Sequence, residues 1–127
     1  DNYPDNLQRT ETIIEVQQGL ILSLEFTAFD VYTYYSNCYD DHLTITDGDG
    51  TTLMEKSCGY YSLPADIRSR SNVVKLVFST SFLHTRPGWS VSWSAVTPGE
   101  CQQCNLANLL FPFNEKKNFF FQLLTML

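Results

Sequence analysis

The sequence predicts an all-β protein built as a two-sheet antiparallel β-sandwich. Apolar and polar residues alternate with a period of two in most segments, and turn signals rich in glycine separate these segments. No segment shows a convincing amphipathic helix. Many short strands at this spacing are typical of a sandwich or barrel. Hydrophobic residues make up 43% and aromatic residues 14% of the 127 residues, which is enough for one packed domain.

Three segments show the alternation most clearly, each with one apolar and one polar face. The residues predicted to face the core are Leu20, Leu22, Leu24, Phe26 and Ala28 in the first, Val74, Leu76 and Phe78 in the second, and Trp89, Val91, Trp93 and Ala95 in the third. Such segments are half-buried strands with polar side chains toward solvent. Because both tryptophans share the face of Val91, we expect core packing rather than a carbohydrate site for them.

The clearest turn signal is Asp47-Gly48-Asp49-Gly50. It predicts a β-hairpin, because Asp-Gly supplies the positive φ angles that tight hairpin turns require. A calcium loop of the EF-hand type is excluded here, since its fifth, sixth and twelfth positions would hold Thr51, Thr52 and Cys58.

The composition changes at residues 97–100, where Thr-Pro-Gly-Glu ends the alternating pattern. We therefore expect one domain over residues 1–97. Residues 98–127 are expected to form a linker or C-terminal extension, either poorly ordered or a junction to a further domain. The alternative is an amphipathic anchor on a partner, because two short apolar clusters lie in this segment.

Charge disfavours a nucleic-acid partner, and hydropathy predicts no membrane span. With 14 acidic and 8 basic residues the formal net charge is −6, whereas nucleic-acid binding needs a basic surface. The longest apolar run, residues 118–127, is too short for a membrane span. The chain opens on a polar stretch rather than a signal peptide, as expected of a mature or trimmed chain.

The cysteines indicate an oxidising compartment. Four are present, Cys38, Cys58, Cys101 and Cys104, and an even number in a small domain suggests disulfides, with three connectivities open. The spacing of Cys101 and Cys104 is half a zinc site at best, and nothing supplies the other half. Pairing locally or with a neighbouring domain is expected for them.

No catalytic motif is present, and we expect the chain not to be an enzyme. The sequence lacks a Gly-x-Ser-x-Gly elbow, a His-Glu-x-x-His helix and a glycine-rich phosphate loop. His42 and His84 are the only histidines, and His42 is expected on the surface face of a strand.

An ordered set of landmarks over residues 1–97 resembles the CUB domain family. The matching stretches are Tyr3-Pro4-Asp5-Asn6, residues 19–30, residues 38–45, Asp47-Gly48, Cys58-Gly59, Leu63-Pro64, residues 71–78 and Gly88-Trp89. The resemblance implies a jelly-roll type sandwich and a secreted, extracellular location. It also implies a disulfide between Cys38 and Cys58, and binding of proteins or glycans without chemistry of its own.

The resemblance also raises the question of calcium, which many CUB domains bind through three carboxylates. Only Asp41 matches that set, and Asp40 is the one residue that could partly compensate. The other two positions hold Tyr32 and Ser81. Because calcium needs several anionic oxygens, we expect no cofactor and no functional metal site.

The partner is expected to bind where the calcium-linked loops of such domains meet. We expect an aromatic patch there, with polar rim contacts, because exposed loop aromatics anchor binding surfaces. Its residues are Tyr32, Tyr34, Tyr35, Phe82 and His84, with Asp41 and Arg86 at the rim. The alternative is that these side chains only cap the core.

Two functions follow from the resemblance. The favoured one is an extracellular binding module, similar to those of seminal adhesins. The alternative is an accessory domain of a secreted astacin-like or trypsin-like protease whose catalytic domain lies outside this chain.

Overall fold

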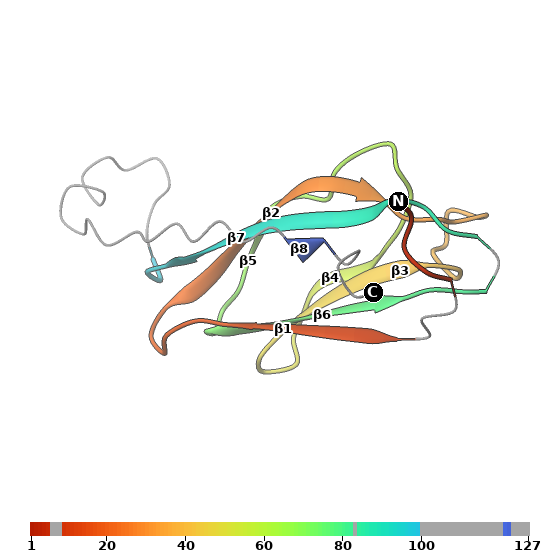
Figure 1. The fold of residues 1–127 in the computed structure, drawn as a ribbon. Coiled ribbons are helices and arrows are strands. Elements are labelled where there is room, and N and C mark those ends of the chain that lie inside the picture. Colours follow the sequence, from red (N-terminus) through yellow and green to blue (C-terminus); the bar gives the residue numbers. More distant parts are fainter. Residues whose placement is uncertain (6–8, 83, 100–120, 123–127) are drawn as a thin grey trace.

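Two antiparallel four-stranded sheets lie one above the other in the computed structural model, which describes residues 1–5, 9–82, 84–99 and 121–122 (Figure 1). The first sheet has the order β1-β6-β3-β4, formed by Thr10–Glu15, Val73–Ser79, His42–Asp47 and Thr52–Ser57. The second has the order β5-β2-β7-β8, formed by Ile67–Arg68, Ile21–Asp30, Gly88–Val96 and Phe121–Gln122. The predicted sandwich is confirmed.

The core lies between the sheets and follows the predicted alternation. Its buried residues are Tyr3, Ile14, Leu22, Leu24, Phe26, Phe29, Val31, Leu43, Ile45, Ile67, Val74, Leu76, Phe78, Trp89 and Val91. Trp93 packs against this cluster from a partly buried position, so both tryptophans contribute to the core as predicted. No helix of the described residues is long and apolar enough to cross a membrane.

One residue predicted to face the core, Ala28, is exposed, and a β-bulge is the reason; Leu20 and Ala95 are half-buried and lie outside the core cluster. The pairing of β2 with β7 shifts register between Phe26 and Ala28. The extra residue turns the end of β2 over, so that Phe29 is buried and Ala28 is exposed. A strict period of two could not show this change of face.

The predicted hairpin joins β3 to β4. Asp47 N donates to Thr51 O over 2.7 Å, and Gly50 adopts a φ of +89°, which glycine reaches without steric cost. Asp47 itself is buried. Its carboxylate is stable there because it accepts hydrogen bonds from Gly48 N, Arg70 N, Ser71 N and Ser71 Oγ. Asp47 therefore fastens the hairpin to the segment before β6.

Beyond residue 97 the structure describes little of the chain. The short strand β8 pairs with β7 at Ser90 and Val91, and the sequence pattern did not indicate this strand. The predictions that residues 98–127 form a linker or extension, and that Cys101 and Cys104 pair locally or with another domain, otherwise concern residues outside the described ranges.

Candidate functional site

Three connections meet at one end of the sandwich because of the strand register. His42 at the start of β3 lies opposite Ser79 at the end of β6, and Asp30 at the end of β2 lies opposite Gly88 at the start of β7. Leu43 lies opposite Ser57 at the end of β4. We call residues 31–41, 58–61, 80–82 and 84–87 the loop end; it lies at the right of Figure 1.

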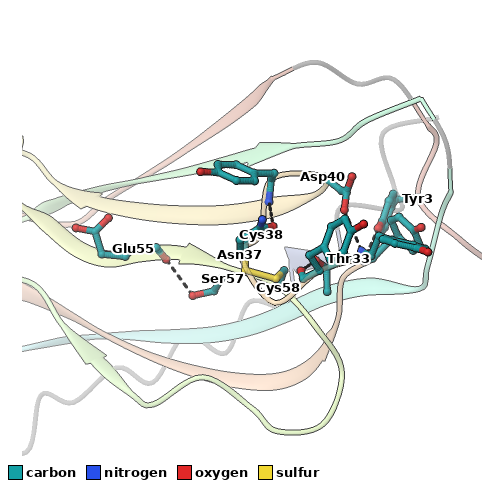
Figure 2. The surroundings of a disulfide bond; sticks show 12 residues. Tyr3, Thr33, Asn37, Cys38, Asp40, Glu55, Ser57 and Cys58 are labelled. Atoms are coloured by element: carbon teal, nitrogen blue, oxygen red, sulfur yellow. Dashed lines mark hydrogen bonds between the residues drawn. A yellow bond between two sulfur atoms is a disulfide. The ribbon is translucent and has the colours of Figure 1, made fainter.

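A disulfide ties the first two of these connections together. Cys38 and Cys58 are bonded, with their Cα atoms 5.5 Å apart (Figure 2), so the pairing implied by the family resemblance is confirmed. Beside it, Gly59 N donates to Val31 O over 2.8 Å, and Val31 N donates to Gly59 O over 3.0 Å. The disulfide and this two-bond bridge hold the tyrosine-bearing loops side by side.

A buried hydrogen-bond chain centred on Asp41 joins three segments. Tyr3 Oη donates to Asp41 Oδ2 over 2.6 Å and accepts a hydrogen bond from Tyr32 N over 2.9 Å. Ser81 N donates to Asp41 Oδ1 over 2.6 Å. Burial, followed by the hydrogen bond to Asp41, raises the pKa of Tyr3 well above its ordinary value, so the phenol keeps the proton that it donates. Figure 2 shows Tyr3 beside the loop that carries Thr33 and Asp40.

An ion pair also joins the end of β2 to the loop before β7. Arg86 Nε donates to Asp30 Oδ1 over 2.9 Å, and Tyr3 N donates to Arg86 O over 3.0 Å. The guanidinium carbon of Arg86 lies 4.8 Å from the ring centroid of Tyr60. The hydrogen bond from Arg86 to Asp30, followed by the negative charge of Asp30, raises the pKa of Arg86 above its ordinary value. The guanidinium therefore stays charged.

Three of the predicted patch residues are strongly exposed, and two others contact each other, the half-buried Tyr32 and the exposed His84. Tyr34, Tyr35 and Phe82 are 72%, 65% and 71% exposed. Tyr32 stacks against His84 with ring centroids 4.7 Å apart, which joins the loop after β2 to the loop after β6. The two loops therefore adjoin, as the family resemblance implied.

The loop that carries Tyr34 and Tyr35 is held by its own hydrogen bonds. Asp40 Oδ2 accepts from Tyr34 N over 2.9 Å, and Thr33 Oγ1 donates to Tyr35 O. Figure 2 shows Thr33 and Asp40 on this loop near Tyr3. The exposed rings are thus presented from an ordered backbone.

The position predicted for Asp41 needs correction. We expected Asp41 and Arg86 at the polar rim; Arg86 is half-exposed, but Asp41 is fully buried. A carboxylate is stable there because both of its oxygens accept short hydrogen bonds. Asp41 therefore orders the loops from inside and cannot touch a partner directly.

Sequence reasoning missed two residues of the loop end, Tyr60 and Tyr61, and the buried Tyr3 that supports it. Tyr3 served only as a family landmark, although its hydroxyl links two loops. Tyr60 and Tyr61 are exposed and stack on each other with centroids 4.2 Å apart. Two successive tyrosines in the loop after Cys58 were the available signal, of the same kind as Tyr34 and Tyr35.

The residues around Asp41 do not fit a calcium ion. Each Asp41 oxygen accepts one protein hydrogen bond, and Asp40 Oδ2 accepts from Tyr34 N, so few anionic lone pairs remain for a cation. The two positions that would supply further carboxylates hold Tyr32 and Ser81. Among the described residues, no group of three or more His, Cys, Asp or Glu side chains could hold a metal ion. The loop after β2 and the loop after β6 are therefore linked by hydrogen bonds within the protein.

The histidines show no catalytic arrangement with the groups described around them. His42 lies half-buried on the outer side of β3, where burial and the nearby charge of Lys56 lower its pKa. His84 stacks on Tyr32. Neither is hydrogen-bonded to a serine or carboxylate in the described part of the chain, which a nucleophilic site would need.

The chain is similar in sequence to parts of much larger proteins. It is 33% identical to cubilin of Rattus norvegicus over 94 residues, which is 74% of this chain and 2% of the cubilin. It is 29% identical to the astacin-like metalloendopeptidase of Gallus gallus over 99 residues, which is 74% of this chain and 24% of that protein. The chain therefore spans a small fraction of these relatives.

Solved structures share the fold. The CUB1-EGF-CUB2 domain of human MASP-1/3 superposes with a TM-score of 0.67 at 22% identity, covering 81% of this chain and 40% of that one. The MASP-1 CUB2 domain bound to Ca²⁺ superposes with a TM-score of 0.63 at 24% identity, covering 72% and 81%. At these identities the likeness establishes the fold alone.

The family assignment depends on a match that extends along nearly the whole sandwich. The family model described as CUB domain matches residues 1–93. This range includes the Cys38–Cys58 disulfide and the Asp41 hydrogen-bond chain. The chain therefore belongs to the CUB domain family.

Proposed function

We propose that this chain is a secreted, extracellular binding module that recognises a protein or glycan partner through its loop end and performs no chemistry of its own. The observation that carries the proposal is where exposed rings gather. Among the described residues, eight large hydrophobic side chains are exposed, and six of them lie at the loop end. These six are Tyr34, Tyr35, Tyr39, Tyr60, Tyr61 and Phe82.

The exposure of these rings argues against a lid over the core. The core at this end is already closed by Tyr3, Val31 and Trp89, which are almost completely buried. Rings that cap a core lose most of their exposure, whereas Tyr34, Tyr35 and Phe82 keep about two thirds or more of theirs. Tyrosine is also the residue that interfaces favour, since its rigid ring loses little entropy on binding.

Two further features support an extracellular location and a binding role. The Cys38–Cys58 disulfide is of the kind that persists in oxidising compartments. The loops are fixed before a partner arrives by the disulfide, the Val31–Gly59 bridge and the Asp41 chain. Preorganised loops lose less conformational entropy on binding, which favours affinity.

A second candidate is the accessory domain of a secreted protease. The similarity to an astacin-like metalloendopeptidase favours it, because this chain matches only 24% of that protein. In such a protein the loop end would bind a substrate or regulator beside the catalytic domain. The full-length transcript distinguishes the two candidates by whether it encodes a catalytic domain.

Alanine variants of the exposed rings test the proposed surface. The full chain is used to capture partners from extracellular fluid by cross-linking, and the affinity of a captured partner is then measured. We expect Tyr34→Ala, Tyr35→Ala and Phe82→Ala to weaken binding, by about tenfold or more for a central ring. Their melting temperatures should stay close to that of the parent chain.

Ile13→Ala is the matched control, because Ile13 is an exposed hydrophobic residue on β1 away from the loop end. It should leave binding unchanged. A large drop in melting temperature in the three ring variants would instead support the core cap. Unchanged binding in all three would eliminate the patch.

A further inference from the structure

The strand β1 forms a long and regular open edge of the first sheet. All residues of Thr10–Glu15 pair with β6 without a register shift, and among the described residues no strand pairs with the other side of β1. A regular edge of this kind presents a row of unpaired main-chain donors and acceptors, which can template a further strand.

The other borders of the two sheets are less suited to accept a strand. The pairing of β4 with β3 shifts register on both sides of Ile45, which distorts the β4 edge. The second sheet is bordered by β5 and β8, which span two residues each. Within the described part of the chain, β1 is therefore the edge best able to pair with another strand.

The main-chain groups that face the open edge follow from the pairing with β6. Val16 N donates to Asn72 O over 2.9 Å, which continues the β1–β6 register by one residue. Opposite residues of an antiparallel pair exchange hydrogen bonds at every second position, so the even-numbered residues of β1 bond to β6. The odd-numbered residues direct their amides and carbonyls to the open edge: Glu11, Ile13 and Glu15.

The side chains beside this edge form an exposed surface whose charges cancel. Ile13 is 59% exposed and lies between the exposed Glu11 and Glu15 on one face of β1. Arg9 Nη2 lies 2.7 Å from one carboxylate oxygen of Glu11, and Lys75 Nζ lies 3.9 Å from the other. The whole chain carries a charge of −6, but these four charges sum to zero, so two copies meet little repulsion at β1.

Two-fold symmetry restricts how two β1 edges pair. Opposite residues of an antiparallel pair lie on the same face, so one residue of β1 opposes itself at the axis. Pairing centred on Ile13 would oppose Glu11 with Glu15 of the second copy, and pairing centred on Glu11 would oppose two Glu11 side chains, which is unfavourable. Pairing centred on Thr12 instead opposes Arg9 with Glu15 of the second copy, which is favourable.

We propose that β1 pairs antiparallel with β1 of a second copy of this chain about a two-fold axis at Thr12, which joins the two first sheets into one. In this register Glu11 of each copy opposes Ile13 of the other. These are residues whose main-chain groups face the open edge, so each such pair exchanges two hydrogen bonds. The proposal goes beyond the proposed function, because the surface lies apart from the loop end.

The dimer presents its two loop ends in opposite directions. Thr10 at the start of β1 lies opposite Phe78 near the end of β6, so β1 begins beside the loop end and runs away from it. The second β1 runs the other way, and its loop end lies at the far end of the joined sheet. Such a dimer is bivalent and can link two partner molecules, one at each loop end.

Sedimentation equilibrium of the full chain measures the association. The paired edges are short and bury less area than a stable interface, so we expect a weak dimer with a Kd of about 0.1 mM, within reach of loading from about 10 µM to about 1 mM. Non-reducing electrophoresis of the same samples shows whether any dimer is disulfide-linked, and such dimers are left out of the fit.

Amide hydrogen exchange of the ¹⁵N-labelled chain tests which edge is used. The amides of Glu11 and Ile13 face the open edge, so their exchange should slow as the concentration rises. The amide of Thr12 is bonded to β6 and should be protected to the same degree at every concentration. This difference between neighbouring residues is specific to pairing along β1.

Charge variants test the register. Arg9→Glu places like charges opposite each other at both ends of the pair and should weaken the dimer about tenfold. Adding Glu15→Arg to this variant reverses the second charge as well, and the double variant should associate like the parent. Both side chains are exposed, so neither change should alter the melting temperature much.

A main-chain variant tests the hydrogen bonds. Ile13→Pro removes an amide that faces the open edge and leaves the bonds to β6 in place, as proline is tolerated on edge strands. It should abolish association. Ile13→Ala is the matched control, because it shortens the same side chain but keeps the amide, and it should change the Kd by less than about threefold.

Three outcomes would overturn the dimer: a chain that stays monomeric to about 1 mM, association that Ile13→Pro and Arg9→Glu leave unchanged, or a double variant that associates no better than Arg9→Glu alone. The proposed function fails or stands separately. The loop-end variants Tyr34→Ala, Tyr35→Ala and Phe82→Ala should dimerise like the parent whether or not they lose the partner.

Discussion

The Tyr3 hydroxyl donates a 2.6 Å hydrogen bond to the buried Asp41 carboxylate across 38 positions of the chain. The same hydroxyl accepts from Tyr32 N, and the other Asp41 oxygen accepts from Ser81 N. One carboxylate thus connects the amino-terminal segment, the loop after β2 and the loop after β6. These loops carry the exposed rings, so the proposed partner surface depends on a buried contact that a partner would not reach.

Removing the Tyr3 hydroxyl should destabilise the fold. In Tyr3→Phe, one Asp41 oxygen and the Tyr32 N–H lose their partner while the ring still fills the core. We expect the free energy of unfolding to fall by about 2 kcal/mol, as for a buried hydrogen bond to a charged group. Urea unfolding measures this, and Tyr35→Phe, at an exposed ring, is the control that should change little.

Asp41→Asn should lower the free energy of unfolding by at least as much as Tyr3→Phe does, because one amide oxygen cannot replace two charged acceptors. A double-mutant cycle of Tyr3→Phe with Asp41→Asn should show strong non-additivity, since both changes break one contact. Additive losses, or a Tyr3→Phe variant as stable as the parent, would contradict the role given to this pair.

Sequence reasoning found the strands and the core better than it found the site. The alternation of apolar and polar residues correctly placed Leu22, Leu24 and Phe26 in the core, because this alternation is a local property of a strand. It failed at Ala28, where a bulge depends on the partner strand β7. Asp41 was placed at the rim because its buried partners Tyr3 and Ser81 lie about 40 positions away on either side.

In the loops too, the sequence predicted what depends on neighbouring residues and missed what depends on residues far apart in the chain. Clustered tyrosines predicted an aromatic surface over Tyr32, Tyr34 and Tyr35, since a loop needs no large rings for a core. Nothing in the sequence placed Tyr60 beside Arg86, because that contact requires the two sheets to be closed on each other. Residue type therefore indicated the character of the surface, and the fold determines its composition.

Loss of the disulfide should destabilise the chain strongly. Replacing Cys38 and Cys58 by serine frees a loop with a sequence separation of 20, and chain entropy predicts a loss of about 3 kcal/mol. Thermal or urea unfolding measures it, and a variant with serine at Cys101 and Cys104 is the control. Non-reducing peptide mapping should recover Cys38 with Cys58; a bridge from Cys38 to Cys101 or Cys104 would contradict the fold.

Calcium should not stabilise the chain. Tyr32 and Ser81 stand where further carboxylates would be needed beside Asp41, so melting curves with millimolar calcium and with a chelator should coincide. A micromolar site would add about 4 kcal/mol at a thousandfold excess, a shift of several degrees for a domain of this size. A shift of that size would show that Asp40 and main-chain oxygens complete a site.

Acid should weaken the fold through Asp47. Burial acts to raise the pKa of this carboxyl, but hydrogen bonds from Ser71, Arg70 and Gly48 outweigh burial and leave the pKa below its ordinary value. A depressed pKa in the folded state contributes stability that is complete above the unfolded value of about 4 and is lost as the pH falls through the folded value.

The variant Asp47→Asn should therefore be less stable than the parent at neutral pH, by about 3 kcal/mol for several lost charge-assisted bonds. The difference should narrow as the pH falls below about 4, because the parent carboxyl then takes up a proton as well. Urea unfolding from pH 7 to pH 2 measures it. Asp66→Asn, at an exposed carboxyl, is the control whose stability should follow the parent at every pH. A constant difference between Asp47→Asn and the parent across this range would mean that the charge of Asp47 plays no part in fastening the β3–β4 hairpin.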